Sequence, residues 1–312
     1  MENIKLPFAN LVQLTQAIPN DQAARIFLEQ IRWNGKPVCP HCGVERENHY
    51  KLNTKGVFEG LYRCKDCRKN FTVTVGTIFE GAHIGLRKWF IAMYLFTAHK
   101  KGISSHQLAR DLGITQKSAW YMVSLLRNLF KQKKVKIEGT VILDESFCGG
   151  KEGNKHANKK TKDTQGRSTK TKTPVFGLLS DGKVNTEVVK DTKADTLKPI
   201  IFDMVKTGAI VVTDEWGAYN GLNKSFQHEV VKHNEGKYVS NGFSTNALEG
   251  FWSLLKRGIF GIYHQVSPKH LNKYCDEFTY RYNTRSSTDA DRFINVLFNA
   301  RERITYKELI SK

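Results

Sequence analysis

The sequence has 312 residues, enough for two or three compact domains, and 40% of them are hydrophobic, as in ordinary globular proteins. Its 49 Lys and Arg residues outnumber 30 Asp and Glu, and the resulting net charge of +19 favours a polyanionic partner, above all nucleic acid. Because the start does not resemble a signal peptide and no apolar run approaches the roughly 20 residues of a membrane-spanning helix, we expect a cytoplasmic protein.

Four of the six cysteines form two Cys-x-x-Cys pairs, Cys39 with Cys42 and Cys64 with Cys67. In a reducing compartment such pairs indicate one tetrahedral site of four thiolates, which suits Zn²⁺. We predict a zinc ribbon over residues 37–80, with strands at residues 62–63 and 71–75. The zinc is expected to be structural, because this segment has too little apolar surface to fold without it.

A helical region, residues 84–132, contains the pattern of a helix-turn-helix. Gly113 would make the turn, and Thr115 would cap a second helix. The side chains expected to face outward from that helix, where a recognition helix meets base edges, are Gln116, Lys117, Ser118 and Tyr121. The alternative is an ordinary helical hairpin between two domains.

From residue 137 onward, strand patterns alternate with helical patterns, which predicts a mixed α/β sheet. Strands are expected at residues 140–147, 174–180, 184–190, 209–213 and 228–233. Helices are expected at residues 194–206, 245–257, 268–283 and 288–300.

A strongly basic segment, residues 149–172, interrupts this pattern after its first strand. It holds eight Lys and Arg residues and almost no apolar ones. We interpret it as a loop that becomes ordered on a phosphate backbone, with Lys151 as one of the contacts. The alternative is a solvated loop without a partner.

Two predicted buried strands carry an aspartate, Asp144 in the first and Asp214 at the end of the fourth. A buried carboxylate without a partner costs free energy, so each needs a cation, a metal or hydrogen bonds. Strand alternation puts Glu145 and Glu215 on the opposite sides, where we assign them to supporting contacts or to solvent. The alternative for one such aspartate is a turn cap.

The helix predicted at 245–257 brings a third acid. Its apolar stripe consists of Leu248, Phe251, Trp252 and Leu255. Another face carries Asn246, Glu249 and Lys256, and the last two are seven residues, or two turns, apart. A metal-binding acid would then have a phosphate-binding lysine beside it, although a lone helical Glu is commonly a surface acid.

The order Asp144, Asp214, Glu249, with a lysine seven residues after the glutamate, resembles that of the DDE transposases. More narrowly, the chain resembles the IS1595 (ISXO2-like) insertion-sequence transposases. The matching runs are Phe27 to Trp33, Cys39 to Gly43, Asp144 to Lys151, Pro174 to Gly177, Thr213 to Tyr219, Thr245 to Gly258, and Tyr274 to Asn283.

This resemblance implies a multidomain α/β protein with an RNase H-like catalytic core. Its parts would be a helical segment at 1–36, the zinc ribbon at 37–80, the helix-turn-helix region at 84–132, and the core at 137–312. The three acids would hold two Mg²⁺ (or Mn²⁺) per active site. Parts of the family are reported to use Asn as the third catalytic residue, so Asn246 remains an alternative, but an anionic oxygen favours Glu249.

The implied function is DNA transposition in a prokaryotic cell, at the nucleoid. The chain would bind the terminal inverted repeats, hydrolyse a phosphodiester at each transposon end, and join the freed 3′-OH to target DNA. Lys256, Arg257 and the 149–172 loop would hold backbone, and the active form would be a homodimer or higher oligomer on double-stranded DNA. The alternatives are a DNA-binding regulator with an inert core and a nuclease that does not join strands.

Overall fold

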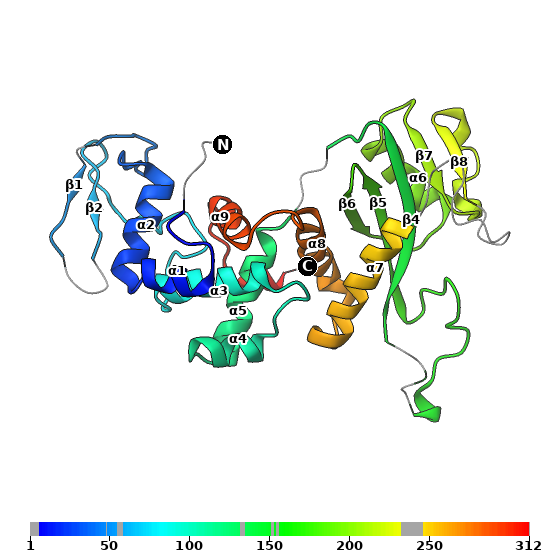
Figure 1. Ribbon diagram of the computed structural model, residues 1–312, viewed down its shortest axis with the longest axis horizontal. Coiled ribbons are helices and arrows are strands. Elements are labelled where there is room, and N and C mark those ends of the chain that lie inside the picture. The colour runs from blue at the N-terminus through cyan, green and yellow to red at the C-terminus, as the bar shows by residue number, and fades with distance from the viewer. Residues whose placement is uncertain are drawn as a thin grey trace. The chain divides into compact units, whose positions relative to one another are not determined.

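The computed structural model describes residues 6–47, 49–54, 59–131, 135–150, 153, 156–231 and 246–311 (Figure 1). The chain divides into two compact units. The first runs to Leu129 and resumes at Ser287, and the second extends from Phe130 to Ser286. None of the described helices is both long and apolar enough to cross a membrane.

Helices dominate the first unit. They are α1 (Leu11–Ala17), α2 (Asp21–Trp33), α3 (Leu86–Ala98), α4 (Ser105–Leu112), α5 (Gln116–Asn128), α9 (Asp289–Asn299) and α10 (Tyr306–Ile310). Their core is aromatic: the ring of Phe293 on α9 lies 5.5 Å from that of Phe8 and 5.8 Å from that of Phe90 on α3. Residues from the two ends of the chain thus share one core.

The predicted zinc ribbon is a three-stranded antiparallel sheet of β1 (Tyr50–Lys51), β2 (Tyr62–Arg63) and β3 (Asn70–Phe71). The strand expected at 71–75 is wrong beyond Phe71. The Arg32 guanidinium of α2 donates to the carbonyl oxygens of Val73 and Val75, so these residues bond to a helix instead of a neighbouring strand.

Helices α4 and α5 are joined as the sequence predicts. Gly113 ends α4 in the left-handed region, at φ 59°, where glycine carries no Cβ penalty. The Thr115 side chain then accepts a hydrogen bond from the Ser118 N–H and caps α5.

The second unit is built on a five-stranded mixed sheet in the order β6-β5-β4-β7-β8. Its strands are β4 (Thr140–Gly149), β5 (Lys172–Ser180), β6 (Lys183–Val188), β7 (Ile210–Thr213) and β8 (Gln227–Val230). The first three pair antiparallel, whereas β7 and β8 run parallel to β4. This order and these directions are those of the expected RNase H-like core.

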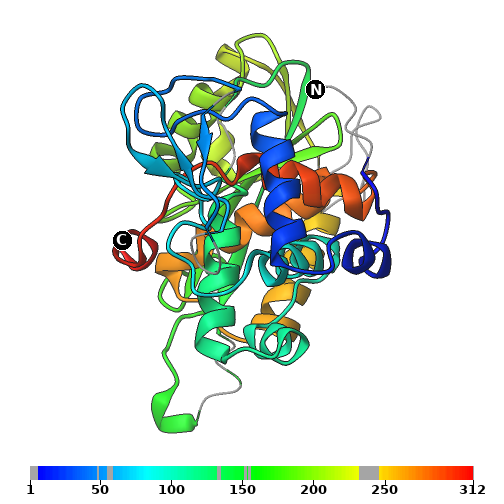
Figure 2. The same cartoon turned by 90° about the vertical axis from the view of Figure 1, so that its left-hand side faces the viewer.

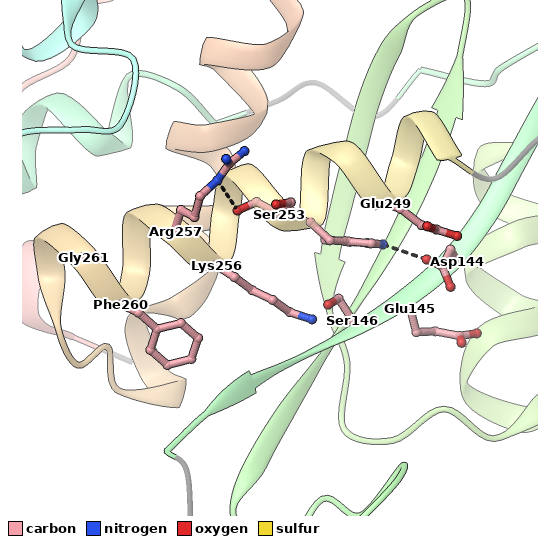
Figure 3. A pocket seen from close by; sticks show the side chains of 10 residues that line it. Asp144, Glu145, Ser146, Glu249, Ser253, Lys256, Arg257, Phe260 and Gly261 are labelled. Carbon is pink, nitrogen blue, oxygen red and sulfur yellow. Dashed lines mark hydrogen bonds between the residues drawn. The ribbon is translucent and has the colours of Figure 1, made fainter. Parts of the chain in front are cut away.

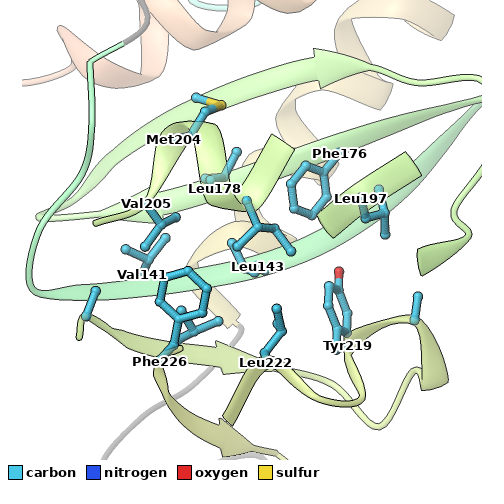
Figure 4. Close-up of a cluster of buried hydrophobic side chains, with 14 of the residues drawn as sticks. Val141, Leu143, Phe176, Leu178, Leu197, Met204, Val205, Tyr219, Leu222 and Phe226 are labelled. Atoms are coloured by element: carbon cyan, nitrogen blue, oxygen red, sulfur yellow. The ribbon is translucent and has the colours of Figure 1, made fainter. Parts of the chain in front are cut away.

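Each face of the sheet has its own hydrophobic core. On one face, Val141 and Leu143 of β4 pack with Leu197 and Ile201 of α6 (Ala194–Met204), and with Tyr219 (Figure 4). On the other face lie α7 (Asn246–Gly258) and α8 (Pro268–Asn283). The predicted apolar stripe of α7, namely Leu248, Phe251, Trp252 and Leu255, is buried there. Because β4 is central, its side chains reach both cores alternately.

The segment between β4 and β5 leaves the sheet. Both views show the short helix at Ala157–Lys159 projecting well beyond the strands that it connects (Figures 1 and 2). The described lysines of this segment include Lys159, Lys160 and Lys162, all exposed. Lys151 lies outside the described residues.

Candidate active site

Two of the predicted acids stand at matching positions on neighbouring strands. In the parallel pair of β4 and β7, Ile142 is opposite Val212. Asp144 and Asp214 each follow two residues later in the chain, so the sheet brings two aspartates that are distant in sequence to one edge. The charge of Asp214 is close enough to contribute to raising the pKa of Asp144.

Asp144 is a largely buried carboxylate that accepts a hydrogen bond from the side chain of Trp252. Its pKa is raised from 3.8 to about 6, mainly by burial and next by the neighbouring charge of Glu145, whereas the Trp252 hydrogen bond opposes the shift. The Trp252 indole Nε1 donates to Asp144 Oδ2 at 2.9 Å (Figure 3). A carboxyl group placed in this way, with further acids close by, is one that a bound cation would stabilise.

A cavity of about 670 Å³ lies between β4 and α7. Glu249 lines it from the first turns of α7 and extends toward Asp144, while the Lys256 side chain points toward Ser146 (Figure 3). The full lining consists of Asp144, Glu145, Ser146, Glu249, Trp252, Ser253, Lys256, Arg257, Phe260 and Gly261. Asn246, the alternative third residue, is exposed at the start of α7 and is not among them.

Asp214 does not line this cavity. Its Oδ2 accepts a hydrogen bond from Arg167 Nη2 at 3.0 Å, and its Oδ1 accepts one from the Trp216 backbone N–H at 3.0 Å. In the described part of the chain, Asp144, Asp214 and Glu249 are not gathered with all their ligand oxygens within 4.8 Å of one another. The structure therefore joins Asp144 with Glu249 in one cavity and places Asp214 beside them, bound to an arginine.

The glutamates that directly follow the two aspartates, Glu145 and Glu215, differ in burial. The Glu145 side chain is fully buried; it accepts from Arg167 Nη1 at 2.5 Å and from the Tyr219 hydroxyl. Glu215 is exposed. Strand alternation predicts that both glutamates point away from the aspartates, and it does not distinguish which one is solvated. The burial of Val141 and Leu143 on the same face of β4 is the signal that marks Glu145 as the buried one.

Sequence patterns gave no site role to Trp252 or Gly177. Trp252 was assigned only to the apolar stripe, yet its N–H binds Asp144. Gly177 on β5 pairs directly with Asp144, and a Cβ there would come within 2.5 Å of the Trp252 ring. A glycine opposite Asp144 thus leaves the space that the indole occupies.

The four outward residues predicted on α5 are only partly free to meet a partner. Gln116 and Lys117 are exposed, and Gln116 Nε2 donates to Ser105 Oγ. Ser118 belongs to the Thr115 cap, and the half-buried Tyr121 ring lies 6.3 Å from that of Tyr306 on α10. Lys117, Ser118 and Tyr121 line a separate cavity of about 420 Å³ with Trp89, Trp120 and Tyr306.

The four predicted zinc ligands come together. The thiol sulfurs of Cys39, Cys42, Cys64 and Cys67 all lie within 4.8 Å of one another. The Cys39–Cys67 and Cys42–Cys64 sulfur pairs are 3.7 and 3.6 Å apart. A tetrahedral Zn²⁺ with Zn–S bonds of about 2.3 Å separates its sulfurs by about 3.8 Å, so the cluster fits zinc.

Comparison with known proteins also separates a zinc-ribbon region from a transposase domain. A family profile described as an ISXO2-like transposase domain (IS1595) matches residues 136–283, and a profile of the transposase zinc-ribbon domain matches residues 19–70. The "Uncharacterized protein in transposable element ISH50" of Halobacterium salinarum is 29% identical over 272 residues, which cover 84% of this chain and 90% of that protein. The "Uncharacterized transposase-like protein" of Haemophilus influenzae is 32% identical over 102 residues, 32% of this chain and 81% of that protein.

Two solved structures of Mos1 transposase are also similar over part of the chain. The pre-cleavage Mos1 transpososome is 13% identical with a TM-score of 0.27, and the match covers 65% of this chain and 75% of that one. The Mos1 paired-end complex with the left transposon end is 14% identical with a TM-score of 0.28, over 64% and 75% of the two chains. Scores this low support no conclusion.

Proposed function

The chain belongs to the IS1595 family of ISXO2-like transposases, and we propose that it cuts the ends of an insertion sequence and joins them to target DNA. We assign the catalytic carboxylates to Asp144, Asp214 and Glu249. The observation that carries this assignment is the convergence of three distant segments: paired strands supply the aspartates, and α7 adds Glu249 to the cavity of Asp144.

The three acids offer only carboxylate oxygens, a donor set that suits hard divalent ions such as Mg²⁺ or Mn²⁺ and not zinc. Two such ions, when bound, would activate the attacking water or 3′-OH and stabilise the leaving oxygen. The chain's own part is to hold the carboxylates in place. Trp252 orients Asp144 by its hydrogen bond, and the Trp216 N–H fixes one oxygen of Asp214. The position of Glu249 in the cavity, which Asn246 does not line, favours Glu249 as the third residue.

The cationic side chains of the same cavity are suited to DNA. Lys256 and Arg257 line it beside the acids, and each could neutralise a phosphate next to the cleaved bond. We assign terminal-repeat recognition to α5 and the zinc ribbon, with Gln116 and Lys117 as the most exposed candidate contacts. Joining two ends requires both to be held at once, so we expect a dimer or larger assembly on DNA.

The test is an assay with labelled transposon-end DNA, target DNA and Mg²⁺, scored separately for cleaved and joined products. Alanine at Asp144, Asp214 or Glu249 should each abolish both products. Glu215→Gln is the matched control, because this exposed acid follows Asp214 directly and should be dispensable. Asn246→Ala should retain the activity that Glu249→Ala loses. The reverse result would identify Asn246, and not Glu249, as the third catalytic residue.

Two other outcomes would replace this proposal. Specific binding of the ends with no metal-dependent cleavage by the unaltered protein would indicate a DNA-binding regulator. Cleavage without joined products would indicate a nuclease.

A further inference from the structure

We propose that Arg167 is a positioning residue for Asp214: through its bridge to buried Glu145 it fixes the carboxylate of Asp214 for metal binding. This inference rests on the proposed function of Asp214. Composition alone made Arg167 one of eight basic residues of a DNA-binding loop. The structure gives it a different environment, on the acids themselves.

The contacts of Arg167 are specific. One guanidinium nitrogen lies 2.5 Å from Glu145 Oε2 and another lies 3.0 Å from Asp214 Oδ2. The guanidinium also covers the Trp216 ring, 4.2 Å from its centroid. A planar cation between two carboxylates and against an indole is held in position and orientation, which a lysine cannot reproduce.

The anchor of this bridge is Glu145. Its side chain is fully buried, and the Tyr219 hydroxyl, buried in the core of that face, donates to its other oxygen. A buried carboxylate requires a compensating partner, and Arg167 is the cation that the described contacts provide. Because the Glu145 side is fixed by the core, the other end of the guanidinium is fixed as well.

Both oxygens of Asp214 are therefore restrained, Oδ1 by the Trp216 N–H and Oδ2 by Arg167. Each carboxylate oxygen can accept more than one bond, so these contacts leave capacity for a metal while setting the direction of the carboxylate. Partners of this kind orient a ligand, and their loss commonly costs about 10- to 100-fold in metal affinity or activity.

The position of Arg167 in the chain gives the bridge a second consequence. Arg167 lies in the segment between β4 and β5, near its return to the sheet at Lys172. The same segment carries the exposed lysines that we assign to DNA backbone. The bridge thus ties a DNA-contacting segment to one of the metal-binding acids.

The experiment measures Mn²⁺ affinity of the zinc-loaded full-length protein by the electron paramagnetic resonance of free Mn²⁺, with no DNA present. Arg167→Gln should weaken binding by about 10- to 100-fold, and Arg167→Lys should fall between it and the unaltered protein. Lys170→Gln is the matched control: this lysine of the same segment pairs with Asp163 at the surface, and its loss should leave Mn²⁺ affinity unchanged.

A double variant separates positioning from folding. Arg167→Gln leaves Glu145 buried without its cation and should lower thermal stability, whereas Glu145→Gln added to it removes that charge and should restore stability. Mn²⁺ affinity should stay low in the double variant, because Asp214 is still unrestrained. Recovery of affinity together with stability would overturn the inference, as would Mn²⁺ affinity in Arg167→Gln equal to or above that of the unaltered protein.

Asp214→Ala distinguishes this inference from the proposed function. If Asp214→Ala abolishes Mn²⁺ binding and strand transfer while Arg167→Gln changes neither, Arg167 has no positioning role and the proposed function stands. If Asp214→Ala leaves both unchanged, the assignment of Asp214 itself is wrong, and the inference is overturned with it.

Discussion

Replacing Gly177 with alanine tests whether the glycine opposite Asp144 is there to admit Trp252. The new Cβ would lie 2.5 and 2.7 Å from two atoms of the indole benzene ring, Cζ2 and Cη2. Favourable carbon contacts begin at about 3.5 Å, so the ring must move by about 1 Å. Trp252 is only 4% exposed and projects from α7 into the core beside the sheet, so its ring cannot move without disturbing the residues packed around it.

The expected cost has two parts. Overpacking a core typically costs about 1 to 3 kcal/mol, and weakening the Trp252–Asp144 hydrogen bond adds about 1 to 2 kcal/mol at most. Together these make about 2 to 5 kcal/mol, and at about 2 to 4 °C per kcal/mol for a unit of this size the thermal midpoint should fall by roughly 4 to 20 °C. Strand transfer should fall by at least about 10-fold, because the partner that orients Asp144 is displaced.

Calorimetry and the end-joining assay on matched samples measure both effects, and Gly250→Ala is the control. Gly250 is a helical glycine of α7 with open space at its Cβ position, so alanine there should be neutral or stabilising by up to about 1 kcal/mol. In Gly177→Ala with Trp252→Phe, the smaller ring lacks the two crowded atoms and donates no hydrogen bond. Stability should largely return while activity stays low. An unchanged thermal midpoint in Gly177→Ala would refute the steric argument.

Three further predictions concern other parts of the chain. Burial raises the pKa of the Asp276 carboxyl from 3.8 to about 6, and the positive charge of Lys131 opposes this shift. Ionised Asp276 therefore destabilises the folded protein. The loss of stability begins as pH rises above about 4 and is complete above about 6. Asp276→Asn should raise the unfolding free energy by about 1 to 3 kcal/mol at pH 8 and by nearly nothing at pH 4, and equal effects at both values in denaturant titrations would contradict this. Zinc chelation should remove hydrogen-exchange protection around Tyr62 and Phe71 while β4 amides stay protected, because the ribbon's three two-residue strands cannot hold it without metal. Lys117→Ala should weaken binding to end DNA and reduce the slope of log affinity against log salt by about 1, and an unchanged slope would exclude a phosphate contact.

Much of the second unit could be predicted because its patterns are local. The apolar run before Asp144 gave a strand that the structure extends over Thr140–Gly149, and the stripe of α7 is buried as expected. Cysteine spacing was sufficient for the metal cluster, since two short knuckles fix where their thiols point. The strand and the helix stripe are each set by residues a few positions apart, and each half of the metal cluster is a Cys-x-x-Cys unit that is recognisable by itself, although the two halves lie 22 residues or more apart.

Partners from distant segments could not be predicted in this way. The helix expected at 288–300 exists as Asp289–Asn299. Its Phe293 packs with Phe8 and Phe90 of the first unit, although the sequence assigns residues up to 312 to the catalytic core. An apolar stripe predicts that one face of a helix is buried, but it does not identify the segment that the face packs against. The Arg167–Glu145 pair could not be predicted for the same reason. The two residues are 22 positions apart, at either end of a projecting loop, and their side chains meet only in the folded structure.

The charges of the site explain why its acids need so many supporting contacts. Asp144, Glu145 and Asp214 bring three carboxyl groups together, and Arg167 pairs with the two on its side. Asp144 accepts hydrogen bonds from neutral donors, the Trp252 indole N–H and the Glu145 backbone, and burial still raises its pKa. Arg167 thus brings one positive charge to Glu145 and Asp214, while Asp144 shares its cavity with a further acid, Glu249. A divalent cation bound there, as we propose, would supply positive charge beside Asp144 and Glu249.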